Sequence, residues 1–123
     1  MVTENYGSWP LGRFEFKAVF RKVTGDRGVT IHVFGPVSGK REEVLRFDCF
    51  EHKPHYHLAW SYRDQPFIPI QASDPLEYSL QALASPNTLL IEAGAEPMDE
   101  DELSALPNAI QSVRHAVAQP RSR

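Results

Sequence analysis

The sequence lacks most of the features that mark a specialised class of protein. It contains a single cysteine, so the chain by itself cannot form a disulfide or a zinc site built from two or four cysteines. No apolar run approaches the ~20 residues that span a bilayer, and residues 1–13 carry no basic-then-apolar leader. We therefore expect no membrane partner and a cytoplasmic location. The 13 basic residues are outnumbered by 16 acidic ones, which argues against nucleic acid as a partner.

What the sequence does contain is the composition of an ordinary folded protein. Of its 123 residues, 41% are hydrophobic and 24% are charged, which is typical of a globular domain and not of a disordered chain. This length lies where single domains are commonest. We see no repeat and no linker, so we predict one α+β domain over residues 1–123, with a sheet over about 14–70 and helices over about 75–118.

The first half of the chain shows the alternation that is typical of β-strands. Apolar and polar residues alternate in four segments, 14–22, 29–34, 44–50 and 55–62. A fifth, shorter strand is expected over 67–70, at a sheet edge because Pro69 has no amide hydrogen. The glycines that follow Thr24 predict a hairpin between the first two strands. The polar segment 36–43 predicts a loop.

The second half shows apolar residues at helical spacing behind capping residues. Asp74 precedes Pro75, which is a typical helix start, and leucines follow at helical spacing. Residues 87–92 fit either a short helix ended by Gly94 or a strand. An acidic cluster that starts at Asp99 begins the last predicted helix, because a helix N-terminus favours anions.

The predicted strands share one nearly continuous apolar face, which the helices can cover. By strand parity this face holds the side chains of Phe14, Phe16, Phe20, Val29, Ile31, Val33, Leu45, Phe47, Leu58 and Trp60. Cys49 belongs to the same face, so we interpret it as a small buried hydrophobe and not as a nucleophile. We predict an α+β fold, in which an antiparallel meander of four to five strands has the C-terminal helices packed on one face.

The opposite face of the predicted sheet carries the residues suited to binding or catalysis. His55 and His57, two apart on one strand, point the same way and can ligate one metal ion. If Glu51–Pro54 is a four-residue loop, Asp48 lies opposite His57 and supplies a carboxylate. His52, in the turn, is a candidate fourth ligand. The pattern predicts a binding site for a divalent metal such as zinc, or for a small anionic ligand.

The same residues support three other interpretations. In an acid–base enzyme of hydrolase or nuclease type, His57 would be the general base, Asp48 would orient it, and Arg46 would stabilise a developing anion. Alternatively, these residues form an ordinary cross-strand ion pair on a solvated face. In the third interpretation a homodimer forms either through this face, which otherwise exposes Phe34 and Phe50, or through the sheet edge at 67–70. The sequence leaves these alternatives open.

A short string within this region resembles a known type of domain. The residues RFDCF at 46–50, followed by PHYH at 54–57, resemble a string in small bacterial domains of unknown function. The resemblance implies membership of such a family and brings no activity with it. The chain is also distantly similar to small toxin-like proteins with histidine-rich sheets, whose acid–base nuclease chemistry would make His55 or His57 the base.

Overall fold

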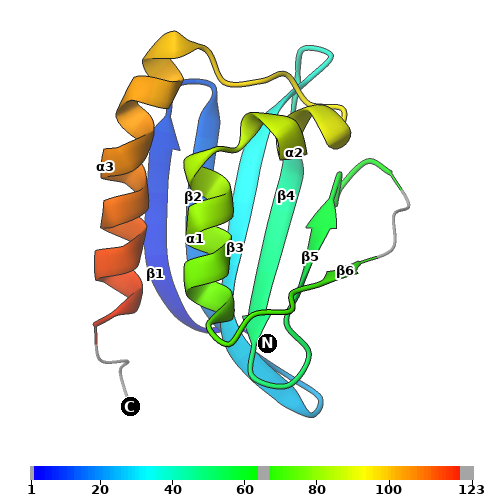
Figure 1. Cartoon of the computed structure of the whole chain (residues 1–123), viewed down its shortest axis with the longest axis vertical. Helices are drawn as coiled ribbons and strands as arrows, with labels where there is room; N and C mark the ends of the chain where they lie inside the picture. The colour runs from blue at the N-terminus through cyan, green and yellow to red at the C-terminus, as the bar shows by residue number, and fades with distance from the viewer. Residues whose placement is uncertain (1, 64–66, 120–123) are drawn as a thin grey trace.

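Six antiparallel strands form one sheet, and three helices lie on one of its faces (Figure 1). This architecture is seen in a computed structural model, which describes residues 2–63 and 67–119. The strands are β1 (Val2–Leu11), β2 (Phe14–Val23), β3 (Asp26–Val37), β4 (Lys40–Phe50), β5 (His55–Leu58) and β6 (Ile68–Pro69). The helices are α1 (Pro75–Ala84), α2 (Asn87–Glu92) and α3 (Glu100–Val117). The predicted α+β meander is confirmed, but it has six strands and not four to five.

The strand that the sequence analysis missed is β1, at one edge of the sheet. It pairs with β2, but its register shifts twice, between Val2 and Glu4 and between Asn5 and Gly7. Each shift breaks the period-two alternation by which a strand is recognised in a sequence. The strand therefore forms without showing the pattern that would predict it.

The segment 36–43 is not the predicted loop, because β3 and β4 continue through most of it. The turn has only two residues, Ser38 and Gly39, with φ angles of 50° and 81°. Two consecutive left-handed residues are typical of the tight hairpin turn that matches the twist of the flanking strands. Pro36 is tolerated within β3, and its carbonyl oxygen accepts a hydrogen bond from the amide of Glu96 at 3.0 Å.

The hydrophobic core lies between the sheet and the three helices. Asp74 caps α1 through the amide of Glu77, and Asp99 forms a capping box with Glu102 at the start of α3. Residues 87–92 form a helix, which settles the alternative of a strand. Buried helix side chains that contribute to the core are Leu80, Leu83, Leu90, Leu106, Ile110 and Val113. None of the helices in the described ranges has the length and hydropathy required to cross a bilayer.

Cys49 packs against this core, as its strand parity predicts. Its side chain is partly buried, and its Sγ lies 3.3 Å from the Oγ of Ser79 on α1. Burial raises the pKa of the Cys49 thiol to about 12. A thiol with so high a pKa stays protonated at neutral pH, which fits a packing role and not that of a nucleophile.

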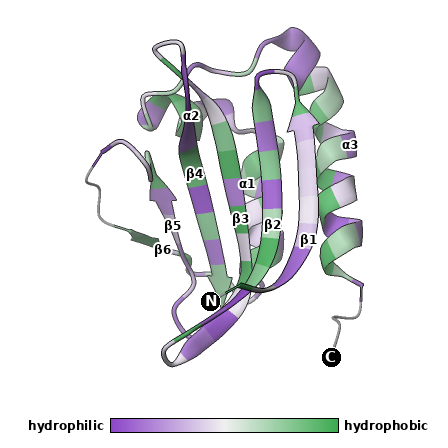
Figure 2. Cartoon of the chain, turned by 180° about the vertical axis from the view of Figure 1, so that it is seen from behind, coloured by the Kyte–Doolittle hydropathy of each residue, from purple (hydrophilic) through white to green (hydrophobic). Residues whose placement is uncertain are grey.

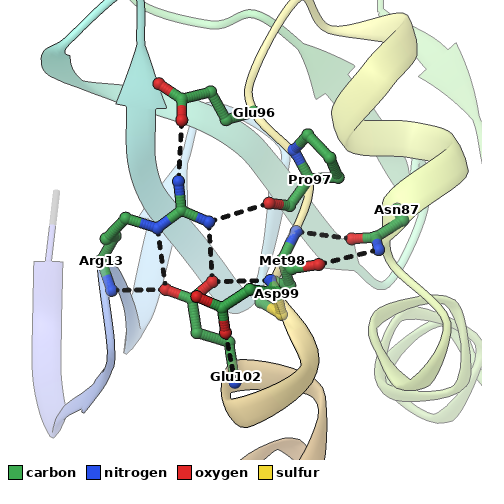
Figure 3. A network of polar contacts seen from close by, with 7 residues as sticks. All are labelled: Arg13, Asn87, Glu96, Pro97, Met98, Asp99 and Glu102. Atoms are coloured by element: carbon green, nitrogen blue, oxygen red, sulfur yellow. Dashed lines mark hydrogen bonds and ion pairs between the residues drawn. The ribbon is translucent and has the colours of Figure 1, made fainter.

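An ion-pair network around the buried Glu102 carboxylate holds the start of α3 against the β1–β2 hairpin (Figure 3). Arg13 donates to the Glu102 carboxylate through its backbone amide, its Nε and one terminal nitrogen, at 2.7, 3.1 and 2.8 Å. The amide of Asp99 adds a fourth donor at 2.9 Å. Gly12, with φ +60°, makes room for this contact, because a Cβ there would lie 2.5 Å from Glu102 Oε2. The network therefore fixes the helix layer to one end of the sheet.

Candidate functional site

The sheet face that the helices leave uncovered carries the candidate site (Figure 2). Asp48 on β4 and both His55 and His57 on β5 point to this face, as strand parity predicts. The predicted register, however, is wrong by two residues. Asp48 pairs with His55, and Arg46 pairs with His57. A shift of two keeps each side chain on its face, so the predicted group survives the error.

The register differs because the pair next to the β4–β5 turn is Asp48 with His55, so six residues (49–54) and not four separate the paired positions. Residues 51–53 are drawn toward the β2–β3 hairpin, where the Asp26 carboxylate accepts hydrogen bonds from the amides of His52 and Lys53 at 3.0 and 2.8 Å. The amide of Glu51 donates to the carbonyl oxygen of Arg27. Phe50 consequently stays paired with β3 and is not available to pair with His55.

Asp48 lies at the centre of the group, and its side chain is only 1% exposed. Its Oδ1 accepts hydrogen bonds from the Thr30 hydroxyl at 2.7 Å, from Arg21 at 3.0 Å and from Arg46 Nε at 3.3 Å. Its Oδ2 has different neighbours: His55 Nε2 at 3.2 Å and His57 Nε2 at 3.5 Å. One carboxylate oxygen is therefore fixed by the sheet, and the other faces two imidazoles.

The pKa of Asp48 lies well below its usual range. Burial alone would raise the pKa of this carboxyl group, but the His57 imidazole, the Arg46 guanidinium and the Thr30 hydroxyl favour the charged form and outweigh that effect. Asp48 is therefore a carboxylate at neutral pH. In that state it can accept hydrogen bonds or bind a cation.

The hydrogen bond of His55 Nδ1 determines the tautomer of the ring, and therefore whether Nε2 presents a lone pair to Asp48. Its Nδ1 lies 2.7 Å from the carbonyl oxygen of Lys53, and because a carbonyl only accepts, Nδ1 carries the proton. In the neutral ring Nε2 then presents a lone pair toward Asp48 Oδ2. Two acceptors at 3.2 Å need a proton or a cation between them.

His57 is enclosed more tightly than His55. Its side chain is 12% exposed, and its Nδ1 is buried without a hydrogen-bond partner among the described residues. The two imidazole rings meet edge to face, with centroids 4.9 Å apart. One possible ligand atom from each of Asp48, His55 and His57 lies within 4.8 Å of the other two, which is a spacing that one metal ion can bridge.

Two aromatic side chains, Trp60 and Phe67, border the imidazole pair. The ring centroids of Trp60 and His57 lie 4.4 Å apart, and those of Phe67 and His55 lie 4.9 Å apart. The prediction that Trp60 points into the core is wrong. Ala59 adopts a φ of 59°, which ends β5 at Leu58 and breaks the alternation on which that prediction relied.

Two other histidines, His52 and His32, lie outside this group, although the sequence predicts His52 as a fourth ligand. His52 is exposed in the β4–β5 turn. His32 is on the same sheet face, but its Nδ1 lies 3.0 Å from the Glu43 carboxylate. Of the aromatic residues expected to be exposed on this face, Phe50 is buried, at 6% exposed, and Phe34 is partly buried, with the Arg41 guanidinium 4.8 Å from its ring centre.

Sequence reasoning did not include Arg21 and Thr30 among the site residues. Thr30 pairs directly with Asp48 across β3 and β4. Arg21 pairs with Gly28, and its guanidinium extends across β3 to Asp48 and the Phe50 ring. The parity of both residues places them on this face, so knowledge of the strand order alone would have identified them.

Comparison with known proteins identifies a family but not an activity. No curated protein and no solved structure matches this chain. The model of the DUF7700 family, described as a domain of unknown function, matches residues 9–117. That match covers most of the chain and includes every residue of the site described above. The chain therefore belongs to the DUF7700 family.

Proposed function

We propose that this protein binds a divalent metal ion, with zinc the best fit, through Asp48 Oδ2, His55 Nε2 and His57 Nε2. The observation that carries the proposal is the convergence of the two Nε2 atoms on one carboxylate oxygen, at 3.2 and 3.5 Å. Ligand atoms about 2.0–2.1 Å from a tetrahedral zinc ion lie about 3.3 Å from one another. The two distances from Asp48 Oδ2 thus match those between ligands of a common ion.

The surroundings of two of these ligands support the proposal. Metal-bound histidines usually donate their second ring N–H to a carbonyl or carboxylate, which fixes the ring orientation. His55 makes this contact with the carbonyl oxygen of Lys53. Asp48 is held by Thr30, Arg21 and Arg46 through Oδ1, so Oδ2 is the oxygen left for a metal.

Three protein ligands leave at least one coordination position for water or for another molecule. A closed structural zinc site has four protein ligands, whereas binding and catalytic sites keep a position open. Imidazole and carboxylate together suit zinc and its first-row neighbours better than calcium or magnesium, which prefer oxygen. We therefore propose a metal-dependent binding site on the sheet face.

The alternative roles draw less support from the geometry. A general base needs a nitrogen that a substrate proton can reach, but His57 directs Nε2 at Asp48 and buries Nδ1. The homodimer interpretation relies on exposure of Phe34 and Phe50, yet Phe50 is buried and Phe34 is partly buried beside Arg41 of the same chain. Metal binding uses His57 Nε2 in the direction it already points, toward Asp48 Oδ2, and does not require a substrate to reach Nδ1.

Isothermal titration of zinc into purified protein tests the proposal. We expect one zinc ion per chain, with affinity at least about 100-fold weaker in His57→Ala and His55→Ala, because each variant removes a ligand. His32→Ala is the matched control, since His32 lies on the same face and is as exposed as His55. His52→Ala tests the fourth predicted ligand and should retain full affinity. Equal affinity in all four variants, or no binding by the wild type, overturns the proposal.

A further inference from the structure

The rings that border the proposed metal site are unusually exposed for aromatic side chains. Trp60 is 43% exposed and Phe67 is 56% exposed. Both rings lie beside the imidazole pair: the centroid of the His57 ring is 4.4 Å from that of Trp60 and 6.4 Å from that of Phe67. Exposed aromatic surface at the border of a polar cluster is typical of a site that receives a ligand.

The charge of this cluster favours an anion. Before any metal is counted, one carboxylate, Asp48, lies beside two guanidiniums, those of Arg21 and Arg46. A bound divalent cation would increase this local positive charge, although the whole chain has a formal net charge of −3. An anionic ligand would therefore be attracted here against the charge of the protein as a whole.

Arg46 links the charged and the aromatic parts of the site. Its guanidinium lies 4.3 Å from the Trp60 ring centre and, among the described residues, donates one hydrogen bond, through Nε to Asp48. Its two terminal nitrogens thus remain as donors beside an aromatic surface. Paired donors of this kind match the two oxygens of a carboxylate.

From these observations we infer that the site binds a small aromatic carboxylate. The carboxylate occupies the open position of the metal and pairs with Arg46, and its ring packs against Trp60 and Phe67. The inference rests on the proposed metal site, to which it adds the chemical class of the ligand. It assigns a function to two exposed rings that neither the core nor the metal requires.

Calorimetric titration of zinc-loaded protein with three simple probes tests the inference. Benzoate has both the ring and the charge, acetate has the charge without the ring, and benzamide has the ring without the charge. We expect benzoate to bind at least about tenfold more tightly than either of the others, because only benzoate uses both the aromatic and the charged contacts.

Phe67→Ala tests the aromatic contact in the protein. Phe67 is mostly exposed, so its loss should leave the fold and the zinc affinity unchanged while benzoate affinity falls by about 3- to 10-fold. Ile91→Ala is the matched control, because Ile91 is 61% exposed on α2, on the helix side of the sheet. It should not change benzoate affinity.

The outcomes separate this inference from the proposed function. Zinc binding without a preference for benzoate, or an equal effect of Phe67→Ala and Ile91→Ala, overturns the inference and leaves the metal site intact. Failure of zinc to bind overturns the metal site and the inference with it. Benzoate preference that depends on Phe67 and on bound zinc supports both.

Discussion

Asp48 and Glu102 are two buried carboxylates with lowered pKa values, but the groups that surround them differ in kind. Glu102 accepts hydrogen bonds from four N–H groups, three of Arg13 and one of Asp99. Asp48 receives comparable donors on Oδ1 only, whereas Oδ2 faces the Nε2 atoms of His55 and His57. Backbone amides and guanidinium groups always donate, but an imidazole nitrogen can donate, accept or bind a metal.

This difference separates a structural network from a candidate binding site. The donors of Glu102 satisfy both of its oxygens, and the pKa falls to about 2 because the Arg13 hydrogen bonds and the Asp99 amide outweigh the effect of burial. At Asp48 the partners of one oxygen can exchange a proton for a cation. We therefore expect mutations at Glu102 to affect stability alone, and mutations at Asp48 to affect stability and metal affinity together.

The largest expected effect is that of Glu102→Gln. The substitution leaves Arg13 without its buried counter-charge and should lower the free energy of unfolding by about 3 kcal/mol. Urea denaturation measures this change in the free energy of unfolding. Glu100→Gln is the control, because Glu100 is exposed in the same helical turn. Zinc affinity should be unchanged in both variants. A change in zinc affinity in Glu102→Gln would remove the distinction between the two carboxylates.

Asp48→Asn should have a smaller effect on stability and a decisive one on binding. The Asn oxygen can still accept the hydrogen bonds made to Oδ1, and its N–H can donate to His55 Nε2, so we expect a loss of about 2 kcal/mol. Zinc binding should be lost, because an amide oxygen is a poor ligand in place of a carboxylate. Glu43→Gln, on the same strand and face, should retain zinc binding. Retained binding in Asp48→Asn would exclude Asp48 as a ligand.

Acid should destabilise the wild type more than Glu102→Gln. The folded pKa of Glu102, about 2, lies below its ordinary value of 4.5, so its contribution to stability is present above pH 4.5 and is lost as the pH falls toward 2. Between pH 4 and 2.5 we expect the wild type to lose about 2 kcal/mol more than the variant. Urea denaturation at a series of pH values measures this difference, and parallel curves would contradict the assigned cause of the pKa shift.

The smallest predicted effect tests the electrostatics of the metal site. Arg21→Gln removes a cation that competes with the metal for the charge of Asp48, so zinc affinity should rise by about tenfold. The metal-free variant should be slightly less stable, because Asp48 loses one hydrogen bond. Isothermal titration with Lys17→Gln, a neighbouring cation on β2, provides the control. A loss of affinity in Arg21→Gln would show that Arg21 supports the metal site instead of opposing it.

The elements that could be predicted from the sequence are those with a regular pattern. The alternation in β2, β3 and β4 predicts which side chains lie on each face of the sheet. The capping residues Asp74 and Asp99 predict where α1 and α3 begin. The group of Asp48, His55 and His57 followed from parity alone, which is why it survived a register error of two residues.

What could not be predicted depends on irregular backbone and on long-range contacts. Nothing in the sequence marks the left-handed conformation of Ala59, which moves Trp60 from the core side to the site. The bonds of the Asp26 carboxylate to the β4–β5 turn set the register, and they join residues far apart in the chain. The strand order, which brings Thr30 and Arg21 to Asp48, is likewise a property of the whole sheet.

X-ray diffraction from zinc-soaked crystals, recorded on both sides of the zinc absorption edge, would locate the metal ion itself. We predict one anomalous peak about 2.0–2.2 Å from Asp48 Oδ2 and from the Nε2 atoms of His55 and His57. A peak at His52 or His32 without one at these atoms would contradict this prediction. Crystals that hold zinc elsewhere, and in which both imidazoles donate hydrogen bonds directly to Asp48, would contradict it as well.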